Sequence, residues 1–176
     1  TRIIITKITS FNSYKTSLYL GIFFCLFFSG YVYATDYTIS NGTTQTSRVT
    51  LTNNDTLTVD SGGEIDYTWP AVDADNRTFP AGTTTITNNG IIEGNCCVID
   101  IRSSTNPKLI NNGTINGKNS SRTIYANNSV DATIINNGDI TILEANDYEA
   151  IDGDDSTGMT ITNNSGATIS SEGDDA

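Results

Sequence analysis

Apolar and polar residues follow two different patterns along this chain. Residues 18–32 are almost all apolar, whereas from Thr35 onward the apolar residues occur in short alternating runs such as Val49-Thr50-Leu51. Alternation over a few residues is typical of a half-buried β-strand, and no stretch after Thr35 has apolar residues at helical spacing. Thr and Ile favour strands, while Asn and Gly favour turns. The pattern therefore predicts an all-β chain of short strands.

The N-terminal segment, up to Ala34, has the three parts of a secretory signal. A basic start leads into the apolar run, and Val32-Tyr33-Ala34 places small or branched residues where a signal peptidase reads. The apolar run is shorter than the roughly 20 residues that a membrane-spanning helix needs. We expect a signal peptide over residues 1–34 that is cleaved after Ala34, and an exported protein.

An Asn-Asn dipeptide recurs in residues 86–176. Its first residues are Asn88, Asn111, Asn136 and Asn163, and each step along the chain is longer than the one before it. An Ile lies between successive pairs and keeps a constant distance to the next pair, so all the variation in length falls before that Ile. A solenoid tolerates insertions confined to one place in the unit, because only that face bulges away from the stacked core.

Three aliphatic columns keep the register of this repeat. One lies two residues before each Asn-Asn, one follows its first Asn by four residues (six in the last unit), and one is the Ile between pairs. We expect these residues to stack in the core: Ile86, Leu109, Ile134 and Ile161; Ile92, Ile115, Ile140 and Ile169; Ile99, Ile124 and Ile151. Three strands in a unit of about 25 residues predict a right-handed parallel β-helix, whose coils lie about 4.8 Å apart.

The Asn-Asn-Gly sequence forms the tight corner of each coil. We expect its Asn side chains to form an amide ladder between coils and its Gly residues to adopt a positive φ. The ladder residues are Asn88, Asn89, Gly90, Asn111, Asn112, Gly113, Asn136, Asn137, Gly138, Asn163 and Asn164. Glycosylation is the functional alternative, because Asn-x-Ser/Thr sequons occur at Asn41, Asn54, Asn76, Asn112, Asn119, Asn127 and Asn163.

Residues 35–85 are less regular than the rest. Residues 66–80, which include Trp69-Pro70 and Phe79-Pro80, interrupt the alternation. We assign residues 35–85 to an N-terminal capping coil and loop region, either an atypical first coil with a loop or a cap over the end of the solenoid.

Two features together resemble the start of an autotransporter passenger domain. They are the run Leu51-Thr52-Asn53-Asn54-Asp55-Thr56-Leu57-Thr58-Val59-Asp60-Ser61-Gly62-Gly63 and the Ile-x-Asn-Asn-Gly-x-Ile units at 86–92, 109–115 (with Leu109 first) and 134–140. The resemblance implies passage through the periplasm, display on the cell surface or release, and outer-membrane attachment only through a C-terminal barrel that this sequence lacks. Because it stops at Ala176 within the repeat, we expect a fragment.

Charge and composition exclude several classes of function. The chain has 9 Lys and Arg against 20 Asp and Glu, a net charge of −11. Such an acidic chain repels phosphate backbones, so nucleic acid is not an expected partner. It has no His, which rules out Ser-His-Asp catalysis and His-ligated zinc. No cofactor is expected.

Two local clusters carry candidate chemistry. In an oxidising compartment Cys96 and Cys97 could form a vicinal disulfide; alternatively one packs inward and the other outward. The acidic loop Asp152-Gly153-Asp154-Asp155, with Asp147 and Glu149 nearby, could bind Ca²⁺ or be a solvated loop. With Glu93 and Asp100 of other coils, the same acids could serve a polysaccharide lyase or hydrolase.

The sequence therefore favours an exported cell-surface β-helix that acts as a stalk or adhesin, without covalent chemistry. Its partner would be an unknown surface ligand, either a glycan or a protein. The alternative is a secreted carbohydrate-active β-helix enzyme. The six basic residues that follow the leader are scattered in the sequence, which weakens that alternative for anionic glycans.

Overall fold

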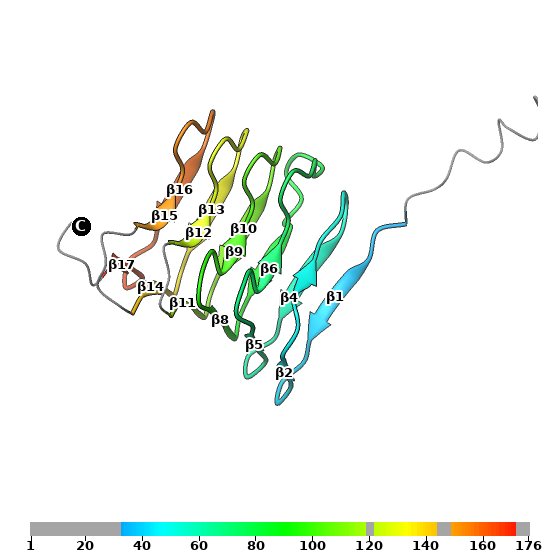
Figure 1. The fold of residues 1–176 in the computed structure, drawn as a ribbon, viewed down its shortest axis with the longest axis vertical. Helices are drawn as coiled ribbons and strands as arrows, with labels where there is room; N and C mark the ends of the chain where they lie inside the picture. The colour runs from blue at the N-terminus through cyan, green and yellow to red at the C-terminus, as the bar shows by residue number, and fades with distance from the viewer. Residues whose placement is uncertain (1–32, 119–121, 144–148, 172–176) are drawn as a thin grey trace, which may run out of the picture. The chain divides into compact units, whose positions relative to one another are not determined.

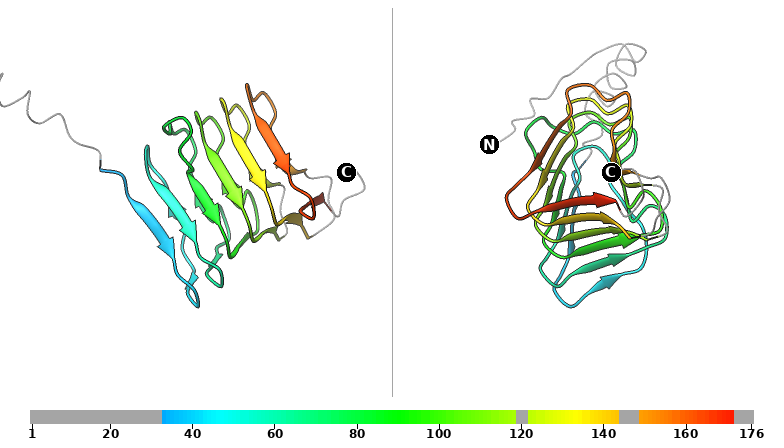
Figure 2. Two further views of the ribbon diagram at one scale, coloured as in Figure 1. Left: turned by 180° about the vertical axis from the view of Figure 1, so that it is seen from behind. Right: turned by 90° about the vertical axis from the view of Figure 1, so that its left-hand side faces the viewer.

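The computed structural model describes residues 33–118, 122–143 and 149–171. Residues 34–176 form one compact unit, a stack of coils in which each coil adds one strand to each of three parallel sheets (Figures 1 and 2). The described residues make five turns and two strands of a sixth. The prediction of an all-β solenoid with coils of about 25 residues, a length typical of solenoid repeats, is confirmed.

Most of the predicted signal peptide lies outside the described residues, which include only Tyr33 and Ala34 from it, both exposed. Among the described residues, no helix is long and apolar enough to cross a membrane.

The three sheets, here named A, B and C, take every third strand of the chain. Sheet A contains β1 (Asp36–Ile39), β4 (Thr56–Val59), β7 (Ile86–Asn88), β10 (Lys108–Asn111), β13 (Thr133–Asn136) and β16 (Thr160–Asn163). Sheet B contains β2 (Thr44–Gln45), β5 (Glu64–Asp66), β8 (Ile91–Gly94), β11 (Thr114–Gly117), β14 (Asp139–Ile142) and β17 (Thr168–Ser171). Sheet C contains β3 (Val49–Thr50), β6 (Val72–Asp73), β9 (Ile99–Asp100), β12 (Arg122–Tyr125) and β15 (Glu149–Asp152).

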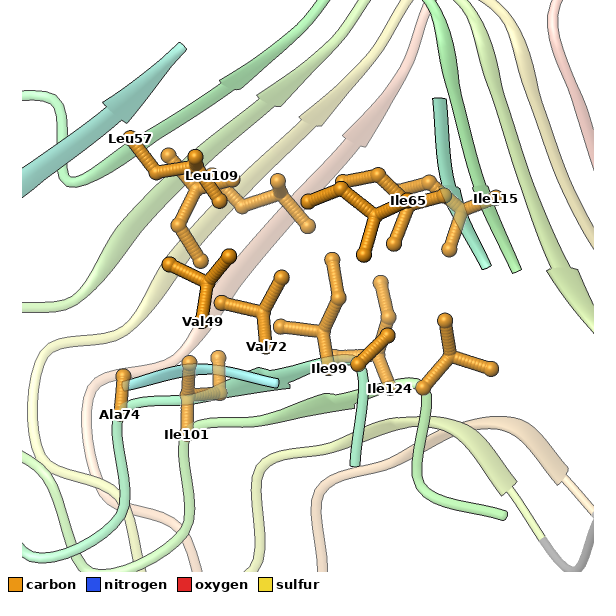
Figure 3. Close-up of a cluster of buried hydrophobic side chains, with 14 of the residues drawn as sticks. Val49, Leu57, Ile65, Val72, Ala74, Ile99, Ile101, Leu109, Ile115 and Ile124 are labelled. Carbon is orange, nitrogen blue, oxygen red and sulfur yellow. The ribbon is translucent and has the colours of Figure 1, made fainter. Parts of the chain in front are cut away.

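Aliphatic residues from all three sheets fill the interior of the coils (Figure 3). The predicted columns are in register: Ile86 pairs with Leu109 in sheet A, Ile92 with Ile115 in sheet B, and Ile99 with Ile124 in sheet C. Eight predicted core residues are fully buried: Ile86, Leu109, Ile134, Ile92, Ile115, Ile140, Ile99 and Ile124. Ile151 and Ile169 are partly buried. Ile161 is 47% exposed, because no described coil covers its side of β16.

Residues 35–85 are more regular than their sequence suggests. They contribute β1 to β6, which continue the same three sheets. Within the irregular segment, Val72 pairs with Ile99, and Phe79 is buried in the core. At the corner after sheet C, isolated parallel β-bridges link successive coils through Thr78, Thr105, Val130 and Thr157. This region thus supplies two coils of the stack.

Two amide ladders run along the corner between sheets A and B. In the inner one, Asn88 Nδ2 donates to Asn111 Oδ1, Asn111 to Asn136, and Asn136 to Asn163, each at 2.8 Å. In the outer one, Asn112 donates to Asn89, Asn137 to Asn112 and Asn164 to Asn137, at 2.8, 2.7 and 2.5 Å. The sequon residue Asn112 therefore already uses its amide nitrogen within the outer ladder.

The expectation of a positive φ at the corner glycines is wrong. Gly90, Gly113 and Gly138 are not among the residues with positive φ. At the same corner of the last coil, Gly166 does have a positive φ. Glycine is needed at 90, 113 and 138 because the backbones of neighbouring coils approach each other closely there. A Cβ on Gly113 would lie 2.1 Å from Gly90 O, and one on Gly138 would lie 2.0 Å from Gly113 O. Only glycine lets neighbouring corners stack this closely.

Candidate functional site

Acidic, basic and aromatic side chains meet on the outer surface of sheet C. Val72, Ile99 and Ile124 point into the core, so the next residue of each strand points away from it. These outward positions form one in-register column: Asp73, Asp100, Tyr125 and Asp152. We define the Asp–Arg face as this column together with its neighbours Arg48, Asp75, Arg102 and Arg122.

The three aspartates of the column divide their two oxygens in the same way. Oδ1 of Asp73, Asp100 and Asp152 accepts a hydrogen bond from the backbone N–H two residues later, at 3.2–3.3 Å. These bonds turn the chain at the end of each strand. Oδ2 of the same residues faces an arginine: Asp73 with Arg48 at 3.2 Å, Asp100 with Arg102 at 3.0 Å, and Asp152 with Arg122. Both oxygens of each carboxylate are therefore engaged.

Asp100 is the most deeply buried carboxylate of the face, with a side chain only 3% exposed. Burial raises its pKa from 3.8 to about 6, and the carboxylates of Asp75 and Asp73 add to that rise. The backbone N–H and the guanidinium of Arg102 oppose it. Asp100 therefore titrates closer to neutral pH than an ordinary aspartate.

Tyr125 breaks the column of aspartates and brings two arginines together. The guanidinium carbon of Arg102 lies 5.0 Å from the centre of its ring, and that of Arg122 lies 4.7 Å away. Both distances fit cation–π contacts. The face thus continues from the Asp100 coil to the Asp152 coil through an aromatic ring and two cations.

A hollow of about 190 Å³ opens at the N-terminal half of this face. It is lined by Trp69, Pro70, Asp75 and the ion pairs Arg48–Asp73 and Arg102–Asp100. Trp69 is 56% exposed, and its backbone oxygen accepts a hydrogen bond of 2.8 Å from Arg48. The hollow combines an exposed aromatic side chain with hydrogen-bond donors and acceptors from three coils.

The structure separates the acids proposed for metal binding or catalysis. Asp152 is buried against Arg122, Asp154 and Asp155 lie in the exposed loop after β15, and Asp147 lies outside the described residues. Glu93 belongs to sheet B, where it pairs with Lys118. In the described part of the chain, three acids that come within 4.8 Å of one another are Glu64, Asp66 and Glu93, and Lys118 also lies 3.9 Å from Asp66. The described acids of the 152–155 loop, for which calcium binding and a solvated loop were both considered, do not form such a cluster.

Cys96 and Cys97 lie at the corner between β8 and β9 as two thiols, with their sulfur atoms 3.2 Å apart. Cys97 is buried and has φ 47°, and Cys96 is half-buried. Burial, followed by the hydrogen bond to Cys96, raises the pKa of Cys97 to about 12. A thiol that stays protonated at neutral pH is a poor nucleophile.

Comparisons with family models, with curated proteins and with solved structures find no match.

The Asp–Arg face was missed by sequence reasoning, although a signal existed. Asp73, Asp100 and Asp152 each follow an aliphatic core residue directly. The three arginines, however, lie at different places relative to the repeat, so they look scattered in the sequence. The fold gathers Arg48, Arg102 and Arg122 on one sheet.

Proposed function

We propose that this chain is a segment of an exported cell-surface β-helix of the autotransporter type, which acts as a stalk or adhesin. The observation that carries the proposal is how its repeated side chains are used. The asparagines bind their counterparts on neighbouring coils, and the column aspartates use both oxygens in turns and ion pairs. Because these amides and carboxylates are already bonded within the protein, they favour a structural and binding role over catalysis of bond cleavage.

The Asp–Arg face is the proposed binding surface. It offers aromatic rings, paired charges and a hollow along one side of the stack, and arginine and aromatic side chains are enriched at binding interfaces. A rod that displays such a stripe can bind a partner away from the membrane in which it is anchored.

Export and adhesion can be tested separately. Full-length protein is expressed in a Gram-negative host, and the secreted or periplasmic form is sequenced from its N-terminus; we expect Thr35 to be first. Ala34→Asp is the control, because a charged residue before the cut blocks the peptidase. Beads coated with the purified protein should then bind cultured epithelial cells more than albumin-coated beads do. Retention in the cytoplasm, or no excess binding, would contradict the proposal.

One observation favours a carbohydrate-active enzyme as a second candidate. The raised pKa of Asp100, with Asp73 and Asp75 close by, is the kind of tuning that a general acid needs. If this candidate holds, incubation with a panel of polysaccharides releases reducing ends or unsaturated products, and Asp100→Asn abolishes the release. Equal release by wild type and Asp100→Asn would assign any cleavage to a contaminant or to other residues.

A further inference from the structure

The hollow beside Trp69 has a chemistry that defines its ligand. Tryptophan usually buries most of its large apolar surface, yet Trp69 is 56% exposed in a chain that has only one Trp. An exposed indole at the edge of a hollow provides a flat apolar surface on which a ring with C–H groups on its face can stack.

The polar lining supplies donors and acceptors in pairs. Arg48 and Arg102 present forked N–H groups, and each lies within 3.2 Å of a carboxylate oxygen of Asp73 or Asp100. A donor beside an acceptor matches a pair of neighbouring hydroxyl groups, each of which both donates and accepts. The arginine and aspartate side chains are ordered by these ion pairs before any ligand arrives, which lowers the entropic cost of binding.

The charges of the hollow select against ionic ligands. Three carboxylates and two guanidinium groups line it, and the whole chain carries a net charge of −11. An anionic ligand meets that excess of negative charge. A cationic ligand has to compete with Arg48 and Arg102 for carboxylates that they already neutralise.

We propose that this hollow binds an uncharged sugar unit, a hexose or N-acetylhexosamine, of a surface glycan. The sugar ring stacks on Trp69, and its hydroxyl groups bond to the Arg48–Asp73 pair and to Arg102 with the more exposed carboxylate of Asp75. The proposal rests on the adhesin function and names the ligand class of its binding face. Tyr125, held beside Arg102 on the next coil, offers a second aromatic surface for a neighbouring unit of an oligosaccharide.

Trp69 is also the reporter for the test, because it is the one Trp of residues 1–176, and Trp69→Phe identifies its share of the emission. The purified protein is titrated with neutral hexasaccharides of glucose, mannose and N-acetylglucosamine, and with heparin and chitosan oligomers as anionic and cationic probes. We expect at least one neutral oligosaccharide to shift Trp69 emission to the blue with saturation, and the charged probes to bind more weakly. No response to any neutral probe, or stronger binding of a charged probe, would overturn the proposal.

Variants separate the site from general effects. Calorimetric titration should show at least about a tenfold loss of affinity for Trp69→Ala and for Arg102→Ala, as for anchor residues in other interfaces. Trp69→Phe keeps an aromatic surface and should retain most of the affinity. Lys108→Gln removes one positive charge on sheet A and should bind as wild type does. Equal affinity of Trp69→Ala and wild type would place binding elsewhere.

The bead assay distinguishes an error in the proposed sugar site from an error in the proposed adhesin function. Beads that bind cells equally well with wild type and Trp69→Ala would overturn the sugar site and leave the adhesin function standing. Beads that bind no cells, from a protein that binds no sugar, would overturn both.

Discussion

At the scale of single residues, asparagine replaces aliphatic side chains in one core column. Ile39 and Val59 occupy this column in the first two coils, and Asn88, Asn111 and Asn136 occupy it in the next three. A buried amide is costly unless its polar atoms are bonded. Asn111 Nδ2 donates to Asn136 Oδ1 and to Asp139 O, and its Oδ1 accepts from Asn88 and from Gly113 N. An amide fits here because it can donate and accept at once.

Asn111→Ala should therefore lower the free energy of unfolding by about 2–4 kcal/mol, because its partners on both neighbouring coils lose bonds inside the core. Asn112→Ala is the matched control: it removes the next amide along the chain, but from the exposed outer ladder, and should cost less than about 1 kcal/mol. Urea denaturation of both variants measures the difference. Similar losses at the two positions would show that burial does not set the strength of the ladder.

Asp55 has a special relation to the predicted cleavage site. Its carboxylate is buried and accepts hydrogen bonds of 2.7 Å from the backbone N–H of Thr35 and from that of Thr52. Burial by itself raises the pKa of Asp55, but these bonds, with the Thr52 hydroxyl and the charge of Arg77, outweigh burial and lower it. Cleavage after Ala34 would turn the Thr35 N–H into an α-ammonium group beside this carboxylate.

Processing should therefore give the protein an ion pair that the uncleaved chain lacks. We expect the processed protein to lose stability as the pH rises from about 7 to about 10, when the ammonium loses its proton, and the uncleaved Ala34→Asp chain to lose less. Asp55→Asn should remove the difference between the two forms. Because the pKa of Asp55 is lowered, its own contribution is present above 3.8 and is lost as the pH falls below that value. Identical alkaline profiles of the two forms in urea denaturation would count against the ion pair.

At the scale of elements, the corner between sheets A and B is set by contacts between coils. Gly63, Gly90, Gly113 and Gly138 follow one another up the stack, and an added Cβ on each of them would lie within 2.4 Å of a carbonyl oxygen of the preceding coil. The backbone φ at Gly113 is one that other residues can adopt. Glycine is needed there because a Cβ would collide with the carbonyl oxygen of Gly90 on the neighbouring corner. Backbone atoms cannot move aside as a flexible side chain can.

Gly113→Ala should thus destabilise the protein by about 2 kcal/mol or more, through overpacking between two coils. Gly153→Ala is the control, because its Cβ would meet only the end of the flexible Met159 side chain. Thermal unfolding followed by circular dichroism should show a large decrease of Tm for the first variant and a small one for the second. Equal shifts would mean that the corners have room to separate.

At the scale of the whole molecule, the excess of acid makes stability depend on pH through many groups. Asp100 acts opposite to most paired carboxylates, because its folded pKa is raised from 3.8 to about 6. The folded state then binds more protons than the unfolded state between these values. The contribution of Asp100 is therefore greatest below about pH 4 and is lost as the pH rises through its folded pKa.

The stability of Asp100→Asn relative to wild type should increase from about pH 4 to about pH 7, by up to about 3 kcal/mol, because the amide does not ionise. Subtracting the two curves cancels the other carboxylates, which both proteins share. A flat difference between Asp100→Asn and wild type would show that Arg102 compensates fully for burial.

The sequence by itself determined the coil length, the three core columns and the Asn-Asn corners. These features repeat because every coil has to fill the same interior and bond to the coils on either side. The residues that do so therefore recur at regular spacing in the sequence. Only the tertiary structure decided the role of the corner glycines and the regular path of residues 35–85. It alone also assembled the Asp–Arg face, because Arg48, Trp69 and Arg102 come from successive coils at unrelated places in the repeat. Their proximity follows from how the coils stack, and it cannot be inferred from the residues near each of them in the sequence.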